Sequence, residues 1–282
     1  LFGVEPNYGC CTANLSQGWP KFAAHLWMAV DGAASEGGRG LAAVAYAPGR
    51  ADTTIAGVPV TAVLTTDYPF RETLHFEITT ARPIDFSLRL RIPAWAEGAT
   101  LEVAGTPQPA PEPGTYVRIY RTWEGTTAVT LTLPMRPELR RGVRNAAAVV
   151  RGPLVYALKM GERWDCYRDD IPGGGYPREC ADWEVYPTTP WNYALDVDEA
   201  TIADDVAFEE RPVGDVPFSP DGAPVTAVVY GRRLPGWITD RGSAADAPPS
   251  PVTSDEELEA LTLIPYGCTN LRVTEFPTLG RE

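Results

Sequence analysis

The residues of this sequence that could most directly do chemistry are two adjacent cysteines, Cys10 and Cys11. They precede an apolar pattern of helical period, which places them near a helix N-terminus. The partial positive charge and unpaired N–H groups of such an end favour a thiolate over a thiol. A thiolate is both a nucleophile and a metal ligand, and two neighbouring thiolates can reach one tetrahedral zinc ion. The pair therefore predicts nucleophilic or metal chemistry.

The residue types alone leave other interpretations of this pair open. A Cys-Cys dipeptide is often two small buried apolar side chains, and a structural zinc or redox role would involve no catalysis. A zinc site takes three or four protein ligands, and the sequence offers no CxxC partner. Of the two histidines, we expect His25 on or near an apolar helix face, packed or hydrogen-bonded, and His75 on the solvent side of a strand.

The remaining cysteines do not indicate a disulfide framework, because the total of five is odd. Cys166 and Cys180 could pair, since the three glycines between them would let the loop close. Free thiols at both positions are the alternative, and the sequence does not decide between the two.

Composition and charge narrow the class of protein. The chain has 282 residues, of which 44% are hydrophobic and 22% charged, which favours a globular protein of two domains. Its formal net charge of −13 repels phosphate backbones, so we expect no nucleic-acid partner. No apolar run approaches the roughly 18 residues of a membrane-spanning helix, so we expect no membrane partner. The chain begins at Leu1 without a visible signal peptide and is interpreted as a fragment, and a homodimer remains an open alternative.

The hydrophobic period changes near residue 40. Before it, four apolar residues recur on one helical face: Leu15, Trp19, Phe22 and Leu26. This pattern predicts a short helix after Cys11, a break near Gly18 and a second helix from about Pro20 to Met28. After it, apolar residues alternate with polar ones over 73–78, 86–92 and 129–133, which predicts antiparallel strands of a β-sandwich.

A second β unit is expected to begin near Gly142. The nearly unbroken apolar run AAAVVRGPLVYAL predicts a strand buried on both faces, and ERWDCYRDDIPGGGYPRECADWE predicts a long loop. Further strand candidates are WNYAL, APVTAVVYGRRL and LTLIPYG. Ser254 could cap a helical turn in SDEELEAL.

Six segments, in order along the chain, carry a family resemblance. They are YGCCTANLSQGWPKF, LRLRIPAWAEGATLEVAG, WEGTTAVTLTLPM, RGPLVYAL, WNYAL and LIPYGCTNLRVTEFP. They resemble glycoside hydrolase family 127 and its relatives, the β-L-arabinofuranosidase-like proteins. Each segment is short, but their order is specific and they extend over nearly the whole chain.

This resemblance implies a fold and a division into domains. The family has an (α/α)6 barrel followed by β-sandwich domains. The implied fold is mainly β, with two β-sandwich domains preceded by the terminal helices of an (α/α)6 barrel. Residues 1–33 would be the C-terminal remnant of the catalytic barrel, residues 34–141 the first sandwich and residues 142–282 the second.

The resemblance also implies roles for the cysteine pair. Cys10 matches the family's catalytic nucleophile, which attacks the anomeric carbon and forms a thioglycosyl intermediate with net retention. Cys10 and Cys11 match two zinc ligands. The implied activity is that of an exo-glycosidase hydrolysing terminal β-L-arabinofuranosides or related sugars, with zinc as the cofactor and a small-molecule or oligosaccharide substrate.

Part of the family's machinery has no counterpart in the sequence. The other two zinc ligands come from a Glu-x-Cys pair, and a separate glutamate is the general acid/base. The sequence has no Glu-x-Cys, Arg178-Glu179-Cys180 has the wrong spacing, and Glu5 matches no motif. The isolated chain is therefore expected to be inactive or nearly so. The alternative is a non-catalytic β-sandwich module that binds carbohydrate or supports other domains.

Six of the eight tryptophans could stack on sugars, but core packing is the better interpretation for most of the six. They are Trp19, Trp27, Trp95, Trp123, Trp191 and Trp237. Arginines on the strands are expected to form a solvated face.

Overall fold

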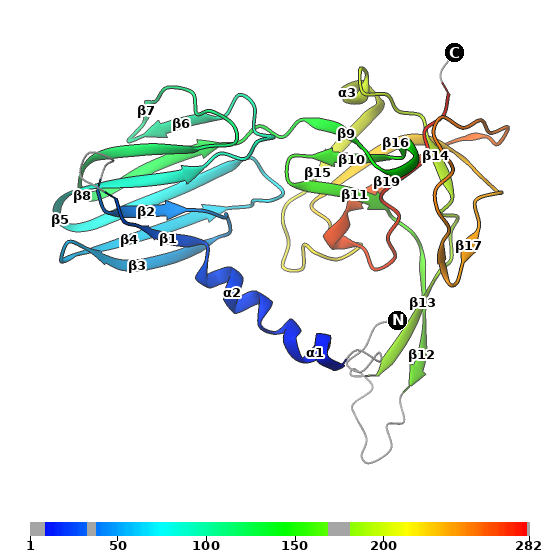
Figure 1. Ribbon diagram of the computed structural model, residues 1–282, viewed down its shortest axis with the longest axis horizontal. Helices are drawn as coiled ribbons and strands as arrows, with labels where there is room; N and C mark the ends of the chain where they lie inside the picture. The colour runs from blue at the N-terminus through cyan, green and yellow to red at the C-terminus, as the bar shows by residue number, and fades with distance from the viewer. Residues whose placement is uncertain (1–8, 33–37, 169–180, 281–282) are drawn as a thin grey trace. The chain divides into compact units, whose positions relative to one another are not determined.

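The computed structural model of the chain describes residues 9–32, 38–168 and 181–280 (Figure 1). Most of the regular structure in these residues is β-strand, so the predicted mainly β fold is confirmed. The chain divides into two compact units, one of residues 16–135 and one of residues 136–282 together with 1–15. The domain boundaries expected after residues 33 and 141 stay a prediction.

The helices in the described part of the chain are short. They are α1 (Gly9–Leu15), α2 (Gly18–Ala24) and α3 (Ile202–Asp205). None of these helices has the length and apolar character needed to cross a membrane. Gly18 begins α2, as the predicted break between two helices requires.

The unit of residues 16–135 is built on one twisted sheet. Its strands are β1 (Trp27–Val30), β2 (Gly40–Ala43), β3 (Gly49–Ile55), β4 (Val58–Thr66), β5 (Thr73–Arg91), β6 (Thr100–Val103), β7 (Thr106–Pro107) and β8 (Tyr116–Thr132). They hydrogen-bond in the order β1-β2-β5-β8-β6-β7, with β4 pairing β5 and β3 pairing β4.

The two longest strands, β5 and β8, each have two halves, and the two halves of β5 pair with different neighbouring strands. The first half of β5, Thr73–Thr80, pairs with β4 and with the end of β8. Its second half, Ile84–Arg91, pairs with β2 and with the start of β8. Between the halves, residues 81–83 stand opposite the single residue Glu124. A bulge of this kind bends a strand, so one pair of strands can serve both layers of a sandwich.

The core of this unit lies between the two halves. The alternation in β5 buries Leu74, Phe76 and Ile78 from its first half, and Phe86, Leu88 and Leu90 from its second half. All six join one cluster with Trp123, whose ring stacks on Phe86 at 5.1 Å. The strand alternation predicted from the sequence is therefore confirmed.

The other unit carries a second sheet. Its strands are β9 (Pro137–Arg141), β10 (Ala147–Arg151), β11 (Leu154–Leu158), β14 (Tyr193–Leu195), β15 (Val206–Glu210), β16 (Val225–Arg233) and β19 (Leu258–Pro265). The order is β14-β16-β19-β11-β10-β9, and β15 also pairs β16. Two small hairpins, β12 (Glu162–Arg168) with β13 (Asp182–Pro187) and β17 (Thr239–Asp240) with β18 (Ser243–Ala244), complete the described strands.

Four local expectations were wrong. Residues 27–30 form strand β1 rather than a helix end, because they pair with β2 and Trp27 packs edge-on against Phe76. The apolar run after Gly142 is a hairpin, β10 and β11, rather than one strand. The expected long loop contains β12 and β13 on either side of residues 169–180. Ser254 caps no helical turn, since its hydroxyl donates to the Arg233 carbonyl and β19 follows.

Candidate active site

Cys10 and Cys11 are the second and third residues of α1, so they lie in the first helical turn. Both side chains are exposed free thiols, and their Sγ atoms are 3.8 Å apart. One turn further on, Nδ2 of Asn14 donates a hydrogen bond of 2.7 Å to the Cys10 carbonyl oxygen. The interpretation of this pair as two small buried side chains is therefore wrong for the chain as described.

The geometry of the pair fits two ligands of one zinc ion. Zinc–thiolate bonds of about 2.3 Å in a tetrahedral site place two sulfurs about 3.8 Å apart. The observed Sγ–Sγ separation is 3.8 Å. Because both thiols are exposed, a metal ion would meet no steric barrier from the described residues around them.

The described residues supply only half of such a site. Within residues 9–32, 38–168 and 181–280, no three His, Cys, Asp or Glu side chains come together in a way that could hold a metal ion. Glu5 and the segment Arg178–Cys180 lie outside the described residues. A complete tetrahedral site around Cys10 and Cys11 therefore needs ligands that the described part of the chain does not contain.

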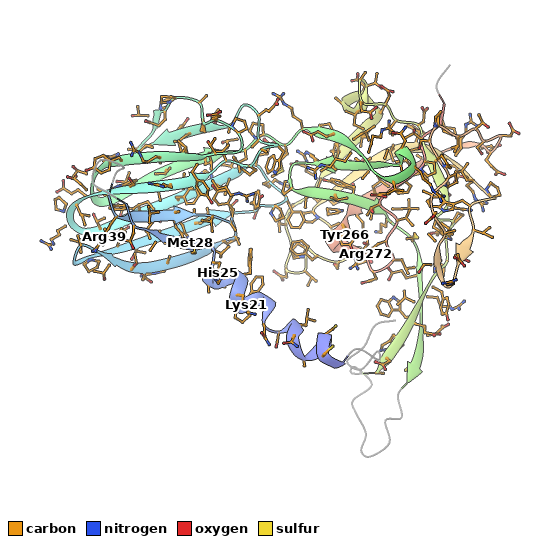
Figure 2. All side chains as sticks on the ribbon, in the orientation of Figure 1. Lys21, His25, Met28, Arg39, Tyr266 and Arg272 are labelled. Carbon is orange, nitrogen blue, oxygen red and sulfur yellow. The ribbon has the colours of Figure 1, made fainter. Side chains whose placement is uncertain are left out.

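Neither histidine belongs to a group of side chains that could hold a metal ion in the described part of the chain. His25 forms the C-terminal cap of α2, and its Nδ1 lies 2.6 Å from the Lys21 carbonyl oxygen, so it is hydrogen-bonded as expected (Figure 2). His75 is exposed on β5, with its Nδ1 3.4 Å from the Thr130 hydroxyl. Its predicted position on the solvent side of a strand is confirmed.

The other described cysteines differ from the pair in exposure. Cys268 is buried, and its thiol donates to the Pro217 carbonyl oxygen at 3.2 Å. Burial raises the pKa of the Cys268 thiol to about 11, which leaves it inert as a nucleophile at neutral pH. Cys166 is a half-buried free thiol, and Cys180, its proposed partner, lies outside the described residues.

Five of the six tryptophans that could stack on sugars pack as expected, and Trp19 is the exception. Trp123 and Trp237 are buried, whereas Trp27, Trp95 and Trp191 are partly buried against hydrophobic clusters. Trp19 on α2 is 74% exposed. Its ring lies 5.8 Å from that of Phe22, and both line a cavity of about 330 Å³ together with Pro48. The sequence pattern predicted a buried face here, but α2 has no buried residue.

A comparison with protein-family models identifies the sheet of residues 16–135. Residues 40–135 match the model described as β-L-arabinofuranosidase, GH127 middle domain. Over this range the chain is similar to the GH127 middle domain. The family resemblance seen in the sequence segments is therefore confirmed for the region that begins at β2 and ends just after β8. No curated protein matches the sequence of this chain.

Solved structures share the fold over a longer range. A GH127 β-L-arabinofuranosidase from Geobacillus stearothermophilus T6 aligns over 95% of the chain, at 21% identity and a TM-score of 0.62. A GH127 β-arabinofuranosidase aligns over 95% at 17% identity, with a TM-score of 0.60. A glycoside hydrolase aligns over 86% at 23% identity, with a TM-score of 0.57. The chain covers only 37%, 38% and 36% of these three structures, respectively.

Proposed function

We propose that this chain is the C-terminal part of a retaining exo-glycosidase that hydrolyses terminal β-L-arabinofuranosides or related sugars. Cys10 is the proposed nucleophile, and Cys10 and Cys11 are two proposed zinc ligands. The observation that carries the proposal is a pair of exposed thiols at zinc-ligand spacing, 29 residues ahead of a GH127 middle domain (40 − 11 = 29).

The proposed reaction has two displacements at the anomeric carbon. In the first, the Cys10 thiolate forms a C–S bond as the glycosidic C–O bond breaks, and the departing oxygen takes a proton from a general acid. In the second, water attacks the same carbon, gives a proton to that same group and releases the thiolate. Two inversions give net retention, and one difficult step is divided into two easier ones.

The residues of α1 would position the nucleophile. The Asn14 hydrogen bond to the Cys10 carbonyl holds the first helical turn, and exposure of Cys10 leaves its sulfur open to a substrate. Bound zinc would keep both thiols deprotonated at neutral pH. With no group of three metal-binding side chains in the described residues, the general acid/base and the remaining ligands are proposed to come from outside the described part of the chain.

The chain by itself is therefore expected to show little hydrolysis. General acid–base catalysis is worth roughly 10²–10⁴-fold, and the described residues would hold zinc through only two thiolates. The active protein is expected to be longer than the chain, in keeping with the small share of the solved structures that the chain covers.

Metal titration of the 282-residue chain tests the ligand assignment directly. Cd²⁺ bound to thiolates absorbs in the ultraviolet, so titration of the reduced chain should give a charge-transfer band that saturates at one ion per chain. Cys10→Ser and Cys11→Ser should each weaken or abolish the band. Cys166→Ser, which removes a half-buried thiol, is the matched control and should leave it unchanged.

Hydrolysis by the longer protein tests the catalytic assignment. There, Cys10→Ser should abolish turnover of an aryl β-L-arabinofuranoside, and rapid quenching of the wild-type protein should trap a glycosyl adduct on Cys10 in mass spectrometry. Unimpaired turnover by Cys10→Ser would refute the nucleophile. A cadmium band that persists in both cysteine variants would refute the metal site and favour a non-catalytic module.

A further inference from the structure

The outer face of the β5–β8 ladder carries an exposed row of arginines and tyrosines. Tyr116 and Tyr120 are 46% and 57% exposed, and Arg118 between them on β8 is exposed too. Arg91 on β5 is exposed and stands directly opposite Tyr116. Alternate residues of a strand share one face, so these four side chains form one surface, the arginine–tyrosine strip.

The polar ends of the strip make no ion pair and no hydrogen bond within the described part of the chain. Neither the Arg91 nor the Arg118 guanidinium has a carboxylate within 4.0 Å, and neither tyrosine hydroxyl makes a hydrogen bond there. Other arginines are paired with carboxylates at 3.0 Å or less: Arg50, Arg141, Arg144, Arg151 and Arg163.

The charge of the strip is positive in a chain whose net charge is −13. Arg118 stands directly opposite a further arginine, Arg89, on β5. Like charges placed directly opposite in a sheet are destabilising. The nearest carboxylate along the ladder, Asp85, lies at its far end and accepts a hydrogen bond from the Thr122 hydroxyl at 2.5 Å. The strip is therefore complementary to an anion that the described chain does not supply.

We propose that the arginine–tyrosine strip binds an acidic oligosaccharide, one whose sugar units carry carboxylates. Guanidinium groups bind carboxylates through two parallel hydrogen bonds. Tyrosine rings offer an apolar face to the carbon-bound hydrogens of a sugar ring and a hydroxyl to its polar edge. Successive side chains of the strip on β8 are about 6.8 Å apart, so Tyr116 and Tyr120 are separated by about 14 Å. An extended anionic chain can contact both rings while its carboxylate lies at Arg118.

The choice of a sugar among anionic polymers rests on the proposed glycosidase function. The strip lies within residues 40–135, the GH127 middle domain, and contains neither cysteine of the candidate active site. It would hold a uronate-bearing part of a polysaccharide independently of the sugar that is cleaved.

Isothermal titration of the 282-residue chain with hexagalacturonate tests this proposal. Maltohexaose, which has no carboxylates, and a hexaglutamate peptide, which has no sugar rings, are the comparison ligands. Hexagalacturonate should bind, and both comparison ligands should bind at least tenfold more weakly. Raising the salt from 0.1 to 1 M should weaken the binding, because the screening length falls from about 10 Å to about 3 Å.

Four variants assign the binding to the strip. Arg118→Gln should lower the affinity about tenfold, the expected loss for one charge-assisted contact, and Arg118→Lys should restore it only in part. Tyr120→Ala should weaken binding, whereas Tyr120→Phe, which keeps the ring, should retain most of it. Arg50→Gln removes an arginine from β3 of the same unit and should have no effect.

Three results would overturn the proposal: equal binding of hexaglutamate, equal binding of maltohexaose, or unchanged affinity in Arg118→Gln and Tyr120→Ala. Thermal melting of each variant shows whether the unit is folded. Cys10→Ser should bind hexagalacturonate as the wild type does. A wild-type chain that binds hexagalacturonate but gives no cadmium band would reject the proposed metal site and leave the strip intact. A wild-type chain that gives the band but does not bind hexagalacturonate would reject only the strip.

Discussion

Trp123 is the residue whose removal should most damage the unit of residues 16–135, because it is the largest fully buried side chain. Its side chain is fully buried, its ring stacks on Phe86 at 5.1 Å with an interplanar angle of 21°, and its Nε1 donates to the Phe86 carbonyl oxygen at 3.0 Å. A buried tryptophan removes 150–250 Å² from water. At about 25 cal/mol per Å² this is roughly 4–6 kcal/mol, and truncation of Phe or Trp to Ala in cores costs about 3–5 kcal/mol.

We therefore expect Trp123→Ala to lower the free energy of unfolding of the unit of residues 16–135 by about 4 kcal/mol, with a further contribution of about 1 kcal/mol from the lost hydrogen bond. Urea unfolding followed by circular dichroism measures the change from the shift in midpoint. Trp19→Ala, at a site 74% exposed in the same unit, is the matched control and should change stability by less than about 0.5 kcal/mol. Equal effects of the two substitutions, or a loss below about 1 kcal/mol for Trp123→Ala, would refute the packing argument.

Three further predictions concern pH, thiol reactivity and strand packing. Hydrogen bonding from Arg141 lowers the pKa of Glu199 from 4.5 to about 2. The stabilisation from this pair should thus be present above pH 4.5 and lost as the pH falls through 2, so the difference in urea midpoint between the wild type and Glu199→Gln should vanish below pH 2. Iodoacetamide at pH 8 should alkylate Cys10 well before the buried Cys268, as peptide mass mapping would show, and equal rates would contradict the assigned exposures. Gly40→Ala would drive a methyl group into a β5 backbone carbonyl and should cost about 1–3 kcal/mol in thermal unfolding, so a neutral result would contradict the close β2–β5 approach.

Strand alternation was the most informative pattern for the fold. In β5 the even-numbered residues from Leu74 to Leu90 face the core on both sides of the bulge, except that Arg82 lies in the bulge itself and Ile84 just after it is only half-buried. Side chains of a strand point alternately to opposite faces, so a half-buried strand shows its period directly in the sequence. The sequence carries no comparable signal for the bulge that bends β5. Two residues of β5 are extra only in comparison with the residues of β8 that pair with it, so the bulge cannot be recognised from the sequence of β5 alone.

The helical pattern at residues 15–26 was less reliable. It correctly indicated a helix that contains Trp19 and Phe22, but these apolar residues are exposed on a helix with no buried residue. Periodicity shows that apolar side chains share one face of a helix. It does not show which part of the protein, if any, covers that face. Residues 27–30 became a strand because β2 offers backbone partners, and a tertiary partner of this kind outweighs local helix preference.

For the candidate site, the sequence and the structure establish different features of the cysteine pair. Adjacency of Cys10 and Cys11 follows from the sequence, and so does their place before a helical pattern. Their exposure and their 3.8 Å Sγ separation required coordinates, because the rotamers of two neighbouring side chains decide whether both sulfurs can face one ion. The sequence likewise treated strand arginines as a general solvated face, whereas the register of β5 against β8 groups Arg91 with Tyr116 and Arg118.

The sequence by itself determined the class of the fold, the position of several strands and the resemblance to family 127, and that resemblance implied the candidate nucleophile. The strand positions depend on short-range features: residue type and period. Tertiary structure alone decided which strands pair, where β5 bends, which tryptophans are buried and which arginines have no carboxylate partner. Those outcomes depend on contacts between residues far apart in the chain, and a local pattern carries no information about its distant partner.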